Sequence, residues 1–123
     1  MSSNEPTLLS GVMGPDGLID PDRLCSRLLI SSSELMVAIG LGRPDASLPA
    51  EWTSPAVQVR LSEVTQIIER VLPWCGSPQQ AFAWFRSQPI PGFGGQTAED
   101  LVCAGRVAHV ASHLERIAAG GFA

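Results

Sequence analysis

The chain has 123 residues, of which 45% are hydrophobic and 16% are charged, and its formal net charge is −4. This size and composition are typical of one folded domain with a hydrophobic core, and they exclude an intrinsically disordered chain. No apolar stretch approaches the roughly 20 residues that a membrane-spanning helix requires.

The eight basic residues are all arginine, so the sequence contains no lysine. A Walker phosphate loop needs a lysine on the nucleotide phosphates, and a Schiff-base enzyme needs a lysine amine. Both chemistries are therefore excluded. The acidic balance also argues against nonspecific binding to nucleic acid, which depends on cations that neutralise phosphates.

The expected compartment is the cytoplasm. The first residues, "MSSNEPTLLSGVMGPDG", have no basic region leading into an apolar block, so they do not resemble a signal peptide. Cys25, Cys75 and Cys103 are odd in number and scattered, with no C-x-x-C pair. Reduced thiols are the expected state.

Two short helices are predicted in the first third of the chain. Residues 1–19 contain three glycines and show no lasting periodicity, which predicts a flexible lead-in. Asp20 followed by Pro21 is a helix-start signal, and this helix is expected to end near Ile30. The segment "SSSELMVAIGLG" predicts a second helix with a serine cap and a glycine stop.

The clearest helix is predicted to begin at Ser54-Pro55 and to end at Pro73 and Gly76. Its apolar residues recur with helical spacing. They are Val57, Leu61, Val64, Ile67, Ile68, Val71 and Leu72.

Three more helical segments are predicted after it. Ser77-Pro78 opens a short helix with Phe82 and Phe85 facing inward, and Thr97 with Asp100 forms a capping box after the loop "SQPIPGFGG". Gly105 then separates this helix from a last one. The expected apolar face of the last helix is Val107, Val110, Ala111, Leu114, Ile117 and Ala118.

No segment alternates with period 2 for long enough to predict a strand. The expected fold class is therefore all-α: a compact bundle of about six short helices around one long helix, with a reduced helix-turn-helix-like part near the N-terminus.

The motifs that suggest metal or anion chemistry are weak. His109 and His113 lie four residues apart near Cys103, but the H-E-x-x-H glutamate and a third ligand are missing. On a helical wheel both histidines fall away from the apolar face, so exposed positions and no metal site are expected. "PGFGGQT" is interpreted as a turn rather than an anion cradle, and the pair Glu99-Asp100 as helix capping. No cofactor is predicted.

Residues 20–53 have the outline of a helix-turn-helix, in which the second helix reads the DNA major groove. The stretch "GRPDASLPAEW" occupies the place of the reading helix and contains two prolines, and from Pro21 to Arg60 four acidic residues balance four arginines. We therefore expect weak DNA binding at most. The candidate DNA-binding residues are Arg23, Arg27, Arg43 and Arg60.

From residue 54 to residue 123, the order of features resembles the toxin-binding domain of the Xre/MbcA/ParS antitoxins. The matching segments are "SPAVQVRL", "GSPQQAFAWF", "GGQTAEDLV", "AGRVAHV" and "HLERIAAGGFA". They span well over half of the chain. Residues 20–53 match only in outline, as a reduced Xre-type helix-turn-helix.

The resemblance implies a non-catalytic antitoxin of a type II toxin-antitoxin system, present as a homodimer. Its implied partner is a RES-domain toxin, an NAD-degrading enzyme whose active-site cleft the antitoxin's C-terminal end blocks. The toxin-binding residues implied are Gly105, Arg106, His109, His113, Arg116, Gly120, Gly121, Phe122 and Ala123. The alternative function is a DNA-binding autorepressor that acts as a helix-turn-helix dimer.

The ending "GGFA" allows two interpretations. Gly120 and Gly121 would let the chain turn, Phe122 would be a rigid apolar anchor in the toxin cleft, and the terminal carboxylate would meet cationic groups that bind NAD phosphates. In the other interpretation, Phe122 folds back over Ile117 or Ala118 as a hydrophobic contact at a glycine-capped helix end.

Overall fold

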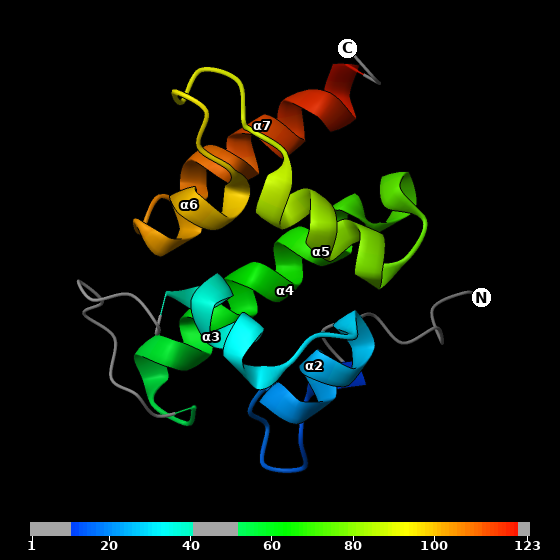
Figure 1. Cartoon of the computed structure of the whole chain (residues 1–123), viewed down its shortest axis with the longest axis vertical. Coiled ribbons are helices and arrows are strands. Elements are labelled where there is room, and N and C mark those ends of the chain that lie inside the picture. Colours follow the sequence, from blue (N-terminus) through cyan, green and yellow to red (C-terminus); the bar gives the residue numbers. More distant parts are fainter. Residues whose placement is uncertain (1–10, 41–51, 121–123) are drawn as a thin grey trace.

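The computed structural model describes residues 11–40 and 52–120, and the named elements within them are all helices (Figure 1). The helices are α2 (Pro21–Leu28), α3 (Ser32–Ile39), α4 (Pro55–Cys75), α5 (Pro78–Ser87), α6 (Ala98–Cys103) and α7 (Val107–Gly120). The predicted all-α fold is confirmed: five shorter helices surround the 21-residue α4.

Helix starts in this chain are set by local side-chain caps. A hydroxyl or carboxylate accepts a hydrogen bond from a backbone N–H of the first turn, which satisfies a donor that the helix itself cannot. Both α3 and α6 have complete capping boxes, in which the third helical residue bonds back to the cap. The caps are Asp20, Ser31, Ser54, Ser77 and Thr97.

Helix α4 is the centre of the bundle and packs against α3, α5, α6 and α7. Its inward side is fully apolar except for Thr65, whose hydroxyl donates to the Leu61 carbonyl oxygen at 2.8 Å. The other buried residues of α4 are Val57, Leu61, Val64, Ile67, Ile68 and Val71. The predicted apolar stripe of this helix is confirmed, with Leu72 partly buried at its edge.

The predicted end of α4 at Pro73 is wrong, because the helix continues through this residue to Cys75. A proline in the last turn removes one backbone donor, and its ring is exposed here. The helix ends at Gly76, which has a φ of 96° and donates its N–H to the Leu72 carbonyl at 2.9 Å. Only glycine adopts this left-handed conformation at little cost.

Residues 11–19 contribute two side chains to the core, so this range is not the flexible lead-in that its glycines predict. Val12 is 0% exposed and Ile19 is 4% exposed. The backbone turns between them, with an isolated bridge from Met13 to Ile19. Gln58 of α4 then bonds to both polar groups of the Ile19 backbone, at 2.8 and 3.1 Å. Residues 1–10 lie outside the described residues.

The turn after α2 contains the single non-glycine residue with a positive φ in the described ranges, Leu29, at φ 58° and ψ 48°. Its side chain is 75% exposed. Its backbone N–H donates to the Cys25 carbonyl and ends the helix. The left-handed conformation is unfavourable for a residue with a Cβ atom.

Truncation of the α4 core should destabilise the protein. We expect Ile68→Ala to lower the free energy of unfolding by about 2–5 kcal/mol, because a fully buried side chain leaves a cavity. Urea unfolding followed by circular dichroism measures this. Gln66→Ala, at an exposed position on the same helix, is the control and should change little. Equal stabilities of the two variants would contradict the packing described.

Relief of the backbone strain at residue 29 should stabilise the protein. Leu29→Gly should raise the free energy of unfolding by about 1 kcal/mol, because glycine removes the left-handed penalty. Leu29→Ala keeps the Cβ atom and should be close to neutral. Urea unfolding followed by circular dichroism measures the stability of both variants. A loss of stability in Leu29→Gly would show that the leucine side chain contributes more than its strained backbone costs.

Candidate partner-binding surface on helix α7

Helix α7 is separated from α6 by a sharp turn at Gly105, which has a φ of 77°. The Gly105 N–H donates to the Val102 carbonyl at 2.9 Å, and the Arg106 N–H donates to the Leu101 carbonyl at 2.7 Å. A Cβ atom at Gly105 would meet nothing within 4 Å, so the positive φ is what favours glycine here. The predicted break at this residue is confirmed.

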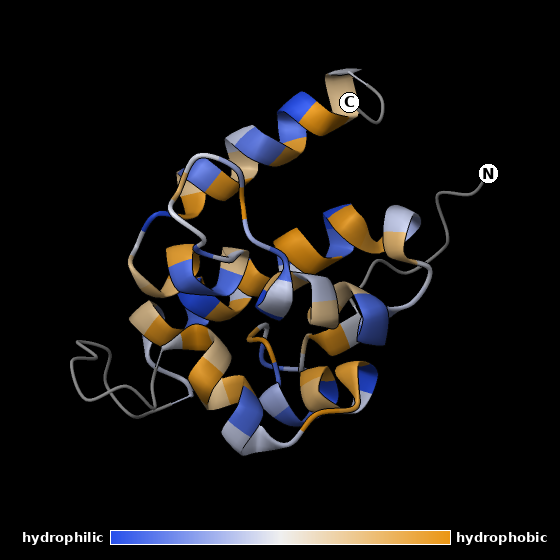
Figure 2. Cartoon of the chain, turned by 45° about the horizontal axis from the view of Figure 1, so that its top comes forward, coloured by the Kyte–Doolittle hydropathy of each residue, from blue (hydrophilic) through white to orange (hydrophobic). Residues whose placement is uncertain are grey.

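One side of α7 anchors the helix to α4 and α6. Val110 and Leu114 are fully buried, and Val107 and Ile117 are partly buried against the core. The predicted apolar face is wrong for Ala118, which is exposed. From residue 118 onward the helix extends past the elements that cover its first turns, as Figure 2 shows at the end marked C.

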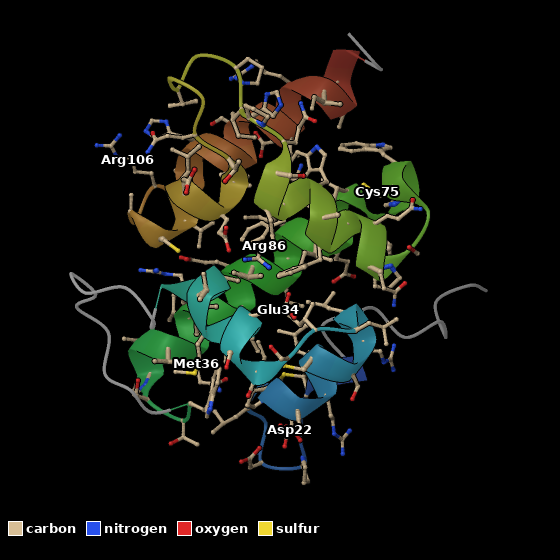
Figure 3. The ribbon with its side chains drawn as sticks, in the orientation of Figure 1. Asp22, Glu34, Met36, Cys75, Arg86 and Arg106 are labelled. Carbon is tan, nitrogen blue, oxygen red and sulfur yellow. The ribbon has the colours of Figure 1, made fainter. Side chains whose placement is uncertain are left out.

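Most of the implied toxin-binding residues in the described ranges lie on another side of α7, whereas Gly105 and Arg106 precede this helix, which begins at Val107. We define the α7 stripe as Arg106, directly before the helix, together with His109, His113 and Arg116, whose spacing of three and four residues brings them to one face of α7. Both arginines and His109 are exposed, and His113 is half-buried. Arg106 points away from the bundle in Figure 3. Gly120, the last residue of α7, falls on the same face.

The implied binding residues at the end of the chain, Gly121, Phe122 and Ala123, lie outside the described residues, as does Arg43.

The loop before α6 contacts the stripe through Phe93. The Phe93 and His109 rings have centroids 4.9 Å apart and planes inclined by 51°. The loop closes on itself, since the Ile90 N–H donates to the Gln96 carbonyl at 2.8 Å. This geometry agrees with the interpretation of "PGFGGQT" as a turn that positions two helices.

His113 differs electrostatically from an ordinary exposed histidine. Burial lowers the pKa of His113 below 6.5, and the nearby positive charge of Arg116 lowers it further. The imidazole is therefore mainly neutral at pH 7. The two arginines supply the fixed positive charge of the stripe.

The structure does not bring Cys103 to the histidines. Its thiol donates instead to the Ala38 carbonyl at the end of α3, at 3.4 Å. Within residues 11–40 and 52–120, no group of three histidine, cysteine, aspartate or glutamate side chains is placed to bind a metal ion. Burial also raises the pKa of the Cys25 and Cys75 thiols, which makes them less reactive.

Two of the candidate DNA-binding arginines within the described residues are already engaged by other groups of the protein. Arg60 donates to the Ile39 carbonyl at 2.9 Å and pairs with Glu63 at 3.6 Å, and its side chain is only 16% exposed. Arg23 pairs with Asp20 at 3.5 Å. Arg27 is exposed on the same short helix α2 as Arg23. Arg60 thus acts as a cap for the end of α3.

A charged cluster centred on Arg86 was not anticipated from the sequence. The Arg86 guanidinium lies 3.3 Å from Glu34 Oε2 (Figure 3). It also lies 3.5 Å from Glu99 Oε2 and sits over the Phe82 ring at 5.4 Å. Glu99 lies in the first turn of α6, as its sequence position predicts, but it is only 8% exposed and is also an ion-pair partner of Arg86. No sequence spacing links Arg86 with Glu34 and Glu99, because these three residues come from three different helices.

A cavity of about 210 Å³ lies between α4 and α7, on the side of α7 away from the stripe. It is lined by Glu63, Gln66, Ile67, Arg70, Val107, Ala108, Ala111 and Leu114. Elsewhere on α4, Val59 before the cavity residues is 58% exposed and Trp74 after them is 42% exposed. Helix α4 therefore presents apolar surface outward as well as inward.

Comparisons of the chain with protein-family models, with curated proteins and with solved structures found no match. None of the helices in the described ranges has the length and hydrophobicity needed to cross a bilayer.

The environment of His113 can be tested by titration. We expect its pKa in the folded protein to lie below 6.5, and Arg116→Gln to raise it, because a repelling charge is removed. The increase should be partial, since burial is the larger cause. NMR of the imidazole protons against pH measures both values. Arg106→Gln is the control for the removal of a more distant charge. An unchanged pKa in Arg116→Gln would contradict the assigned contact.

Proposed function

We propose that the chain is an antitoxin that binds and blocks a RES-domain NAD-degrading toxin, acting by occlusion and not by catalysis. The observation that carries this proposal is the ordered set of segments over residues 54–123 that resembles Xre/MbcA/ParS antitoxins. The geometry of α7 supports it, because the basic stripe and the last helical turn are exposed rather than packed into the bundle.

In this proposal the two sides of α7 have different tasks. Val110 and Leu114 fix the helix to the bundle, so that the stripe is presented on a rigid element. A binding surface that is already ordered loses less conformational entropy on association. The residues after Gly120 would then enter the toxin's cleft, with Phe122 as the apolar anchor.

We also propose that the free antitoxin is a homodimer. The exposed Val59 and Trp74 and the apolar lining of the α4–α7 cavity are the surface that supports this. Specific DNA binding should be weak, because Arg60 and Arg23 are already engaged within the protein and Arg60 is largely covered.

Co-expression with a RES-domain protein encoded beside this chain's gene tests the function. The expected result is co-purification of the two proteins and suppression of NAD consumption by the toxin. Stable folding of both proteins without any complex or inhibition would contradict the proposal. Tight, selective binding to the gene's own promoter would favour the autorepressor instead.

The effect of the chain's last residues on toxin inhibition can be measured separately from their effect on folding stability. Phe122→Ala should leave the thermal midpoint almost unchanged and reduce toxin inhibition at least tenfold, because binding energy concentrates in buried aromatic anchors. Leu29→Ala, which truncates an exposed apolar residue elsewhere, is the control. A lower midpoint with intact inhibition would support the alternative, in which Phe122 packs on the end of its own helix.

A further inference from the structure

The two arginines of the α7 stripe take part in no ion pair among the residues that the structure describes. In residues 11–40 and 52–120 the ion pairs use Arg23, Arg60 and Arg86, and none involves Arg106 or Arg116. Glu115 is adjacent to Arg116 in the chain, but successive helical residues point about 100° apart. The stripe is therefore a face of one sign in a protein whose net charge is −4.

The stripe also has a defined length and an apolar edge. Its two arginines lie ten positions apart in the chain, which corresponds to about 15 Å along a helix. Between them lies the pair of rings formed by Phe93 and His109. Packing against Phe93 limits the positions that the His109 ring can adopt, and the anchored helix fixes the backbone position of Arg116.

We propose that the α7 stripe binds an acidic surface of the partner protein, with Arg106 and Arg116 pairing to carboxylates about 15 Å apart and the Phe93–His109 rings packing between them. This inference rests on the proposed function and adds the chemistry of the surface that the toxin presents to α7. Arginine suits this role because its planar guanidinium binds carboxylates through two parallel hydrogen bonds.

A protein surface is favoured over nucleic acid as the occupant. Duplex DNA carries a charge about every 1.7 Å along its axis, and strong binding requires many cations that follow the phosphates. The stripe offers two fixed charges about 15 Å apart, and His113 between them is mainly neutral at pH 7. Such spacing fits a few separate carboxylates better than a continuous phosphate backbone.

Exposed charges of this kind should act mainly on the rate of association and on its dependence on salt. The test uses the double variant Arg106→Gln/Arg116→Gln and, as a matched control, Arg23→Gln/Arg27→Gln on α2. Binding of each full chain to the RES-domain protein is measured by surface plasmon resonance at about 50 and about 300 mM NaCl, which span the screening range. Circular dichroism verifies that each variant is folded.

At the lower salt concentration, the α7 double variant should bind at least tenfold more weakly than the original chain, chiefly through slower association. Its affinity should also fall less between the two salt concentrations. The α2 double variant should behave like the original chain. Unchanged affinity and unchanged salt dependence in the α7 double variant would overturn the inference while leaving the proposed function intact.

Failure of the proposed function has a different signature, because the original chain itself would not bind the RES-domain protein at either salt concentration. Binding of an acidic ligand to the α7 stripe is then tested with a peptide of about ten glutamates, which is long enough to span the stripe. This peptide should shift the NMR signals of His109 and His113 in the original chain and not in the α7 double variant. Absence of these shifts, or shifts with duplex DNA alone, would overturn the inference.

Discussion

Burial of the inward side of α4 is the constraint on which the rest of this structure depends. Helices shorter than about 12–15 residues are marginal in water, because nucleation is costly. The helices α2, α3, α5 and α6 have 8, 8, 10 and 6 residues, so none is expected to persist alone. They become stable by covering α4 directly or, for α2, by packing on α3 and α5. The stability of the short helices therefore depends on the one long amphipathic helix α4.

Polar contacts then select one arrangement of these short helices. Arg60 of α4 satisfies a carbonyl at the end of α3, and Arg86 of α5 connects α3 with α6. Gln79 of α5 donates to the Arg27 carbonyl of α2 at 2.8 Å. Each contact joins residues distant in sequence and requires a specific geometry, whereas apolar burial is satisfied by many geometries. These contacts therefore specify the packing more than they add to its overall stability.

The sequence predicts features that depend on near neighbours. The cap at Ser54, the stripe on α4 and the glycine turn at Gly105 are all local, so spacing and residue type suffice. The burial of Ile19 and the capping role of Arg60 are not local, because each depends on a partner some 20 to 40 residues away. The α7 stripe depends on both near neighbours and distant residues. Its spacing is visible in the sequence, but the ring contact with Phe93 requires the folded structure.

The use of arginine for every cation has a chemical consequence for regulation. Guanidinium groups suit this fold, since Arg86 contacts two carboxylates and an aromatic ring at once. The same choice leaves these 123 residues without a side-chain primary amine. Lysine acetylation, which neutralises many protein surfaces, has no target among them. The side-chain charge of the α7 stripe can therefore change through histidine protonation, while its arginine charges persist under conditions that acylate lysine-rich surfaces.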